Sequence, residues 1–169
     1  FIYNDEYKAT LWKQWHGKVK NHPECYLKLC LLCPPHFFIS DIFNIIPLFP
    51  IFMKCDIKES LDLLIFTIMS MTMNEDDSQD PQMSSALLSQ LQFIIPILLE
   101  YLNYRKTEDA HIRLDVCKVI SLMPLAVSLK ELKTYKPVVV KALRVVLDDP
   151  KREVRQSAAQ ANMMWLKIH

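Results

Sequence analysis

The sequence predicts an all-α fold, an α-solenoid of about four helix pairs that form a single domain over residues 1–169. Apolar residues recur at helical spacing along nearly the whole chain, and three segments repeat one template of apolar positions. Gly17 is the only glycine, whereas an average usage of about 7% would supply about twelve. Because phosphate loops and tight hairpins need several glycines, the composition excludes a phosphate-loop nucleotide site and disfavours a hairpin-rich β protein.

The expected helices begin and end where prolines and polar residues interrupt the apolar periodicity. Asp56 and Thr107 carry side chains that cap helix N-termini, and the carboxylates after Thr107 suit the positive end of a helix. Prolines stand at or near the expected breaks, at positions 23, 34, 35, 81, 124 and 150. The expected helices cover residues 4–19, 24–32, 41–53, 56–71, 84–102, 108–122, 135–147 and 151–167.

An internal repeat is the strongest feature of the sequence. Three helices place apolar residues at i, i+4, i+7 and i+11, with a basic residue directly after the first. The three sets are Ile57-Lys58, Leu61, Leu64 and Ile68; Ile112-Arg113, Val116, Val119 and Met123; and Val154-Arg155, Ala158, Ala161 and Trp165. Each set follows a helix that carries a proline, at position 50, 96 or 137.

Ile112 and Val154 are 42 residues apart, and Ile57 and Ile112 are 55 apart because the polar stretch 74–82 intervenes. Helix pairs that recur about every 40 residues are typical of α-solenoids of the HEAT or armadillo kind, in which stacked neighbours share one core. The predicted pairs span residues 1–33, 41–73, 84–123 and 129–167. Their core is expected to include Leu61, Leu64, Ile68, Ile94, Leu98, Val116, Val119, Val139, Leu143, Val154, Ala158 and Trp165.

Charge is distributed unevenly along the chain. The formal net charge is +1, but residues 1–128 carry a net −4 and residues 129–169 a net +5. No apolar run reaches the roughly 18 residues that a membrane span needs. The start at Phe1 is neither a methionine start nor a signal peptide, so we expect a fragment of a longer protein. The five cysteines, an odd number, indicate reduced thiols in the cytoplasm or nucleus.

The last repeat carries the most specific motif, Asp148-Asp149-Pro150-Lys151-Arg152-Glu153-Val154-Arg155, which is similar to the inter-helix turn of HEAT repeats. An aspartate in this turn can accept from backbone N–H groups and pair with the arginine of a neighbouring repeat. We therefore expect Asp149 and Arg155 to belong to a ladder of such contacts along the helix pairs.

Residues 129–166 resemble one HEAT family more closely. The matching residues are Tyr135-Lys136-Pro137, Lys141-Ala142-Leu143, Leu147-Asp148-Asp149, Lys151-Arg152, Val154-Arg155 and Trp165. They resemble the extreme C-terminus of the methyl-methanesulfonate-sensitivity scaffold, the large subunit of the cytosolic iron–sulfur assembly targeting complex. Upstream, the resemblance rests on the order of elements, and the short connection from Leu27 to Ile57 and the acidic stretch 74–82 depart from the family.

The resemblance implies a docking module with no chemistry of its own. We expect no cofactor and, from the lack of a long apolar run, no membrane partner. In that family the C-terminal HEAT region binds the small cluster-carrying assembly factor, which in turn holds a WD40 partner. The longer scaffold recruits iron–sulfur apoproteins of DNA repair and replication, such as the XPD-type helicase, in the cytoplasm and nucleus. The alternatives are a HEAT fragment of another adaptor, such as a transport receptor or vesicle coat, and a weak nucleic-acid-binding solenoid.

The basic last quarter supplies the candidate partner-binding residues, which are Lys136, Lys141, Arg144, Lys151, Arg152 and Arg155. An acidic protein partner fits this group, because complementary charge steers protein association. Nucleic acid fits less well, since three acidic residues interrupt the group and no aromatic run offers base stacking. The remaining interpretation is a solvated helix face with internal salt bridges.

Two other residue groups invite chemical interpretations. Cys30-Leu31-Leu32-Cys33, with Cys25, His36 and Cys55 nearby, suggests a metal or cluster site. Its apolar setting and the lack of a second CxxC favour buried structural thiols instead. The histidines are scattered, so no nucleophile–base arrangement is expected. On the first helix, Trp12 and Trp15 are expected to pack against the second helix or to expose a face that upstream repeats would bury.

Overall fold

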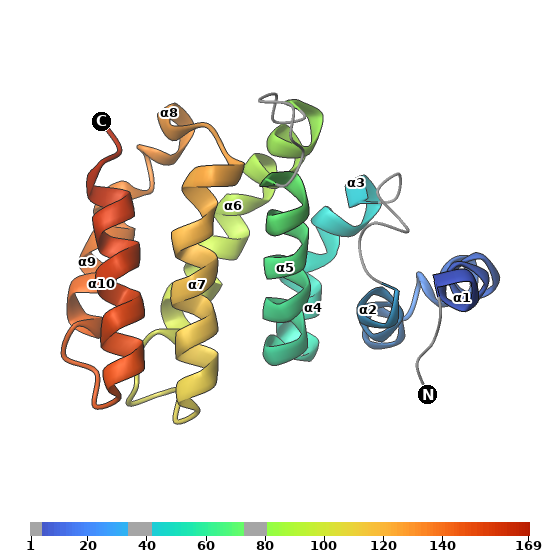
Figure 1. The fold of residues 1–169 in the computed structure, drawn as a ribbon, viewed down its shortest axis with the longest axis horizontal. Coiled ribbons are helices and arrows are strands. Elements are labelled where there is room, and N and C mark those ends of the chain that lie inside the picture. The colour runs from blue at the N-terminus through green and yellow to red at the C-terminus, as the bar shows by residue number, and fades with distance from the viewer. Residues whose placement is uncertain (1–4, 34–41, 73–80) are drawn as a thin grey trace.

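The computed structural model describes residues 5–33, 42–72 and 81–169, all of whose regular elements are helical, with no strand among them (Figure 1). The acidic stretch at 74–80 and His36 lie outside these ranges. The helices are α1 (Asp5–Val19), α2 (Pro23–Leu32), α3 (Ile42–Ile45), α4 (Phe49–Cys55), α5 (Ile57–Thr72), α6 (Pro81–Tyr101), α7 (Ala110–Ala126), α8 (Leu129–Leu132), α9 (Lys136–Val146) and α10 (Arg152–Leu166), with a 3₁₀ turn at Ile46–Leu48.

The longer helices form two rows (Figure 1). α5, α7 and α10 stand side by side, and α7 packs against both of its neighbours in this row. Behind them lie α4, α6 and α9, which contact α5, α7 and α10 respectively. α2 is seen end-on beside α5 and packs on α4 and α5, and α1 lies on the far side of α2. The three helices of the front row are those that carry the repeated apolar template.

The apolar template explains which faces the helices bury. All twelve residues expected in the core are buried, and Trp165 is fully enclosed. Positions i+4, i+7 and i+11 of each set are inaccessible, whereas Ile57 and Ile112 at the first position are partly covered. Because these positions fall on one side of a helix, the core forms a continuous stripe along the front row.

Several expected boundaries were wrong. The helix expected at 41–53 is broken into α3, the 3₁₀ turn and α4, because Pro47 and Pro50 occupy first-turn positions and begin new elements. α8 was not expected. Thr107 does not cap α7, since Asp109 is the N-cap residue and accepts a hydrogen bond from the His111 N–H at 2.9 Å. Asp56 does cap α5, accepting from the Glu59 N–H at 3.0 Å.

Pro124 does not end a helix, contrary to expectation, because α7 continues to Ala126. Proline has no N–H for the carbonyl four residues earlier, which here belongs to Ile120. That carbonyl instead accepts the indole N–H of Trp165 from α10 at 2.8 Å. A side chain 45 residues away therefore satisfies the polar group that Pro124 leaves without an intrahelical partner.

The long helix α6 corrects the expectation about apolar runs. Its segment Gln82–Tyr101 is long and apolar enough to cross a membrane by length and composition alone. One such helix is weak evidence for a membrane span, because a core helix passes the same test. α6 packs against α4, α7 and the 3₁₀ turn, and its residues Leu87, Leu91, Ile94 and Leu98 are fully buried.

The first helix pair is held by aromatic packing. Trp12 is buried and stacks on Tyr26 of α2, with ring centroids 6.0 Å apart, as expected for packing against the second helix. Trp15 is 45% exposed, with the Lys18 ammonium 5.1 Å from its ring centroid. The two tryptophans, three residues apart, therefore differ, one in the core and one on the surface.

Candidate functional site

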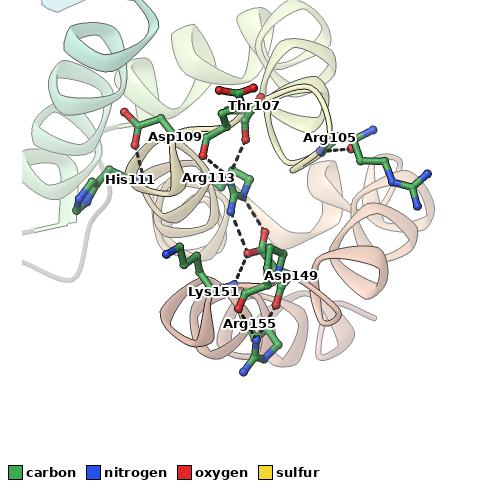
Figure 2. Close-up of polar contacts among 11 residues, drawn as sticks. Arg105, Thr107, Asp109, His111, Arg113, Asp149, Lys151 and Arg155 are labelled. Atoms are coloured by element: carbon green, nitrogen blue, oxygen red, sulfur yellow. Dashed lines mark hydrogen bonds and ion pairs between the residues drawn. The ribbon is translucent and has the colours of Figure 1, made fainter.

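A buried ion pair joins α7 to the turn before α10 (Figure 2). The Arg113 Nε donates to Asp149 Oδ2 at 2.7 Å, and Nη2 donates to Asp149 Oδ1 at 3.0 Å. Both residues are almost inaccessible, at 2% and 1% exposure. Two parallel N–H···O bonds between a guanidinium and a carboxylate fix both distance and orientation. The predicted pairing of Asp149 with an arginine of another helix is therefore confirmed, with Arg113 of α7 as the partner.

The remaining hydrogen-bonding groups of this pair are also engaged. Arg113 Nη1 donates to the carbonyls of Thr107 and Glu108 at 2.6 and 3.1 Å, in the turn before α7. Asp149 Oδ1 also accepts the Lys151 N–H at 2.8 Å. A buried charge is tolerated when its partners are complete, so this cluster ties two inter-helix turns together.

Arg155 makes the same contacts with its own preceding turn that Arg113 makes. Its Nη1 donates to the carbonyls of Asp149 and Pro150 at 2.6 and 3.1 Å (Figure 2). These carbonyls lie six and five residues before Arg155, which is the spacing of Thr107 and Glu108 before Arg113. Arg155 therefore belongs to the same series of contacts, as expected.

A weaker, exposed contact extends the series toward α5. Lys58 Nζ lies 3.3 Å from Asp109 Oδ2. Lys58, Arg113 and Arg155 occupy the same place in the repeated template, directly after its first apolar residue. Asp109 and Asp149 each accept the backbone N–H two residues ahead, and each pairs with the basic residue of the preceding helix in the front row.

The electrostatics of the cluster follow from these contacts. Burial by itself would raise the pKa of Asp149, but the hydrogen bonds from Arg113 and the Lys151 N–H, together with the charges of Arg113 and Arg155, bring that pKa below its usual value. Cys117 lies one turn after Arg113. Burial, helped by the charge of Asp149, raises the pKa of the Cys117 thiol to about 12. The aspartate is thus held ionised, while the cysteine is held as an unreactive thiol.

The six predicted partner-binding residues fall into two groups. Lys141 and Arg144 are exposed on α9, and Lys151 and Arg152 are exposed at the start of α10, across the short turn that follows α9. Lys136 lies at the other end of α9 and donates to the carbonyls of Leu166 and Ile168 at 3.1 and 2.6 Å.

Lys136 therefore donates to backbone carbonyls at the C-terminal end of α10, and Arg155 donates to backbone carbonyls in the turn before α10. Both are partly buried. The four exposed cations form no ion pair with any residue in the described ranges, and we call Lys141, Arg144, Lys151 and Arg152 the basic surface.

The cysteines divide into buried and exposed thiols. Cys30, Cys33 and Cys117 are buried, whereas Cys25 and Cys55 are exposed. The Cys33 thiol donates to the Lys8 carbonyl at 3.4 Å, and burial raises its pKa. Among the described residues, no group of three or more His, Cys, Asp or Glu side chains is placed to hold a metal ion.

Two residues that the sequence did not single out are central to this region. Arg113 was visible only as the basic member of the repeated template, and Ile120 contributes its carbonyl rather than its side chain. No family model matches the chain, and neither a curated protein nor a solved structure matches it. Membership of a HEAT family therefore stays a prediction that rests on the sequence motif.

Proposed function

We propose that this chain is a docking scaffold without catalytic activity, built as a segment of a HEAT-like α-solenoid. The supporting observation is how its charged groups are used. Arg113, Asp149, Arg155 and Lys136 are engaged in contacts between and within the helix pairs, whereas the basic surface on α9 and α10 is exposed. An exposed group of like charges on rigid helices is suited to binding an acidic partner.

The partner that we propose is the small cluster-carrying assembly factor of cytosolic iron–sulfur delivery, together with its WD40 partner. This choice rests on the resemblance of residues 129–166 to the methyl-methanesulfonate-sensitivity scaffold. On this proposal the chain acts in the cytoplasm and nucleus, and iron–sulfur apoproteins such as the XPD-type helicase are reached through the longer scaffold. The chain itself contributes a rigid cationic surface.

A binding experiment with charge-reversed variants tests this proposal. Purified assembly factor with its WD40 partner is captured on the immobilised chain, and the dissociation constant is measured at two salt concentrations. Lys141→Glu with Arg144→Glu should weaken binding by tenfold or more, because like charges then face each other. A salt-dependent affinity in the unaltered chain is also expected, since exposed charges are screened.

A matched control reverses two other exposed lysines on the same helix pair. Lys130 lies in α8 and Lys133 directly follows it, and both are exposed, so Lys130→Glu with Lys133→Glu changes the net charge equally but leaves the basic surface intact. Equal loss of binding in both double variants would refute a local site. If the unaltered chain does not bind the assembly factor, the choice of partner is wrong, and a gel-shift with duplex DNA and RNA at physiological salt then tests the nucleic-acid alternative.

A further inference from the structure

One flank of α10 corresponds to the flank of α7 that α10 itself covers. Arg113, Cys117, Ile120 and Pro124 of α7 lie at i, i+4, i+7 and i+11, and the residues 42 positions later are Arg155, Ala159, Asn162 and Leu166. These spacings place each set along one side of its helix. We call the second set the α10 flank.

The two flanks differ in exposure. Arg113, Cys117 and Ile120 are all at or below 2% exposure because α10 packs on them. On the α10 flank, Ala159 is exposed, Arg155 is partly buried and Leu166 is 41% exposed. The main contacts of α10 are with α7 and α9, and α10 stands at the far edge of the front row in Figure 1.

The contacts of α7 show what a helix needs in order to cover such a flank. α10 supplies a carboxylate, Asp149, in the turn before it, and this carboxylate meets Nε and Nη2 of Arg113. α10 also supplies a donor further along, the Trp165 indole, which meets the Ile120 carbonyl. The turn therefore provides the charge, and the helix provides apolar surface with one polar contact.

The α10 flank offers matching groups. Arg155 uses Nη1 on its own turn, as Arg113 does, and its Nε and Nη2 make no hydrogen bond to any described residue. Asn162 stands where Ile120 stands in α7. Its Oδ1 is already buried by the chain itself and makes no hydrogen bond in the described part of the chain, so it is not accessible to a partner. The open donors of Arg155 are therefore the polar groups that this flank offers.

We propose that the α10 flank is a docking surface for a helix pair of a partner protein whose inter-helix turn presents an Asp or Glu carboxylate to Arg155. The inference follows from the α7–α10 interface and does not depend on the identity of the partner of the basic surface. A second copy of this chain is the weaker occupant, because the Lys20-Asn21-His22 turn of its first pair carries no carboxylate. The chemistry required is an acidic turn followed by an apolar helix.

A tandem chain tests this chemistry directly. A second copy of residues 128–169 is joined after His169, so that the acidic turn of the appended copy can offer its carboxylate to Arg155. Ala159→Cys, on the α10 flank, should react quickly with a thiol reagent in the unextended chain and at least tenfold more slowly in the tandem chain. Gln160→Cys is the control, since Gln160 is also exposed but faces away from the α10 flank.

The role of Arg155 is measured in the same tandem chain. Arg155→Met should change the unfolding equilibrium constant at least about tenfold more in the tandem chain than in the unextended chain, and Asp149→Asn in the appended copy should remove that difference. Unchanged labelling of Ala159→Cys, or an equal effect of Arg155→Met in both chains, would overturn the proposal. Self-association of the unextended chain in sedimentation, lost on Arg155→Met, would overturn the choice of a partner protein in favour of a second copy.

Discussion

At the scale of residues, the Arg113–Asp149 pair shows how one ion pair joins two helix pairs. Its charges are buried, which is costly, but the bidentate geometry and the extra bonds to backbone groups compensate for the lost water. The pair stabilises the fold only when both members are present, because the loss of one leaves a buried charge without a partner. Removal of either member should therefore destabilise the fold far more than removal of an exposed charge.

Asp149→Asn tests this dependence. The variant leaves the Arg113 guanidinium without its anion, and we expect a loss of about 3–5 kcal/mol in the free energy of unfolding at neutral pH. Urea denaturation measures the loss, with Glu153→Gln, an exposed change in the first turn of α10, as the control. A loss equal to that of the control would mean that the pair contributes nothing.

The loss of stability in Asp149→Asn should become smaller at low pH. The pKa of Asp149 is lower in the folded chain than its usual value of 3.8. Its contribution is therefore complete above about pH 4 and declines as the pH falls through the lowered pKa. The difference between wild type and Asp149→Asn should be constant from pH 7 to pH 5 and shrink below pH 4.

The pKa of Asp115 in α7 is shifted in the opposite direction to that of Asp149. Burial and the charge of Asp62 raise its pKa, so its ionised form is disfavoured in the folded chain. Asp115→Asn should therefore increase stability at pH 7, and the increase should vanish as the pH falls below the usual aspartate pKa of 3.8. A loss of stability in Asp115→Asn at pH 7 would contradict this reading of its surroundings.

At the scale of elements, α7 shows how tertiary contacts let a helix continue through proline. Pro124 removes the N–H that would bind the Ile120 carbonyl, and the Trp165 indole from α10 replaces it. The carbonyl in the last turns of α7 that proline leaves open is thus satisfied by the neighbouring helix. Sequence rules for helix ends contain no such neighbour and place the break at Pro124.

A double-mutant cycle on Pro124 and Trp165 tests the replacement. Trp165→Phe leaves the Ile120 carbonyl buried without a donor, which costs roughly 1–3 kcal/mol beyond the packing loss. In the Pro124→Ala background the new N–H can bind that carbonyl, so the same change should cost less by about that amount. Urea denaturation of the four chains gives the coupling, and additive effects would show that the indole bond is not needed.

At the scale of the whole molecule, the continuous core divides the five thiols. Cys30, Cys33 and Cys117 lie within it, and Cys25 and Cys55 lie outside it. The pKa of Cys117 at about 12 leaves almost no thiolate at pH 8. Burial and the near-absence of thiolate therefore both protect Cys117.

Thiol labelling measures this division. At pH 8, iodoacetamide should modify Cys25 and Cys55 rapidly and the three buried cysteines only after urea is added. Peptide mapping by mass spectrometry assigns each site. Rapid modification of Cys117 in the native chain would mean that the α7–α10 packing opens readily.

The sequence by itself determined the helices of the front row and their buried residues. The apolar template is local and periodic, so it identifies the same face whatever the partner. It also predicted that Asp149 pairs with a neighbouring repeat, because the turn motif carries the acceptor. The four residues of the basic surface were visible as charges, but their separation from Lys136 and Arg155 was not.

Only the tertiary structure decided contacts whose partners lie far apart in the chain. It selected Arg113 as the partner of Asp149, assigned Lys136 to the end of α10 and supplied a donor for the carbonyl that Pro124 leaves open. The physical reason is that the apolar pattern of a helix specifies which of its faces is buried, but not which neighbouring element packs against that face. A polar group is satisfied by whichever donor packing brings within about 3 Å, and that depends on the arrangement of the whole molecule.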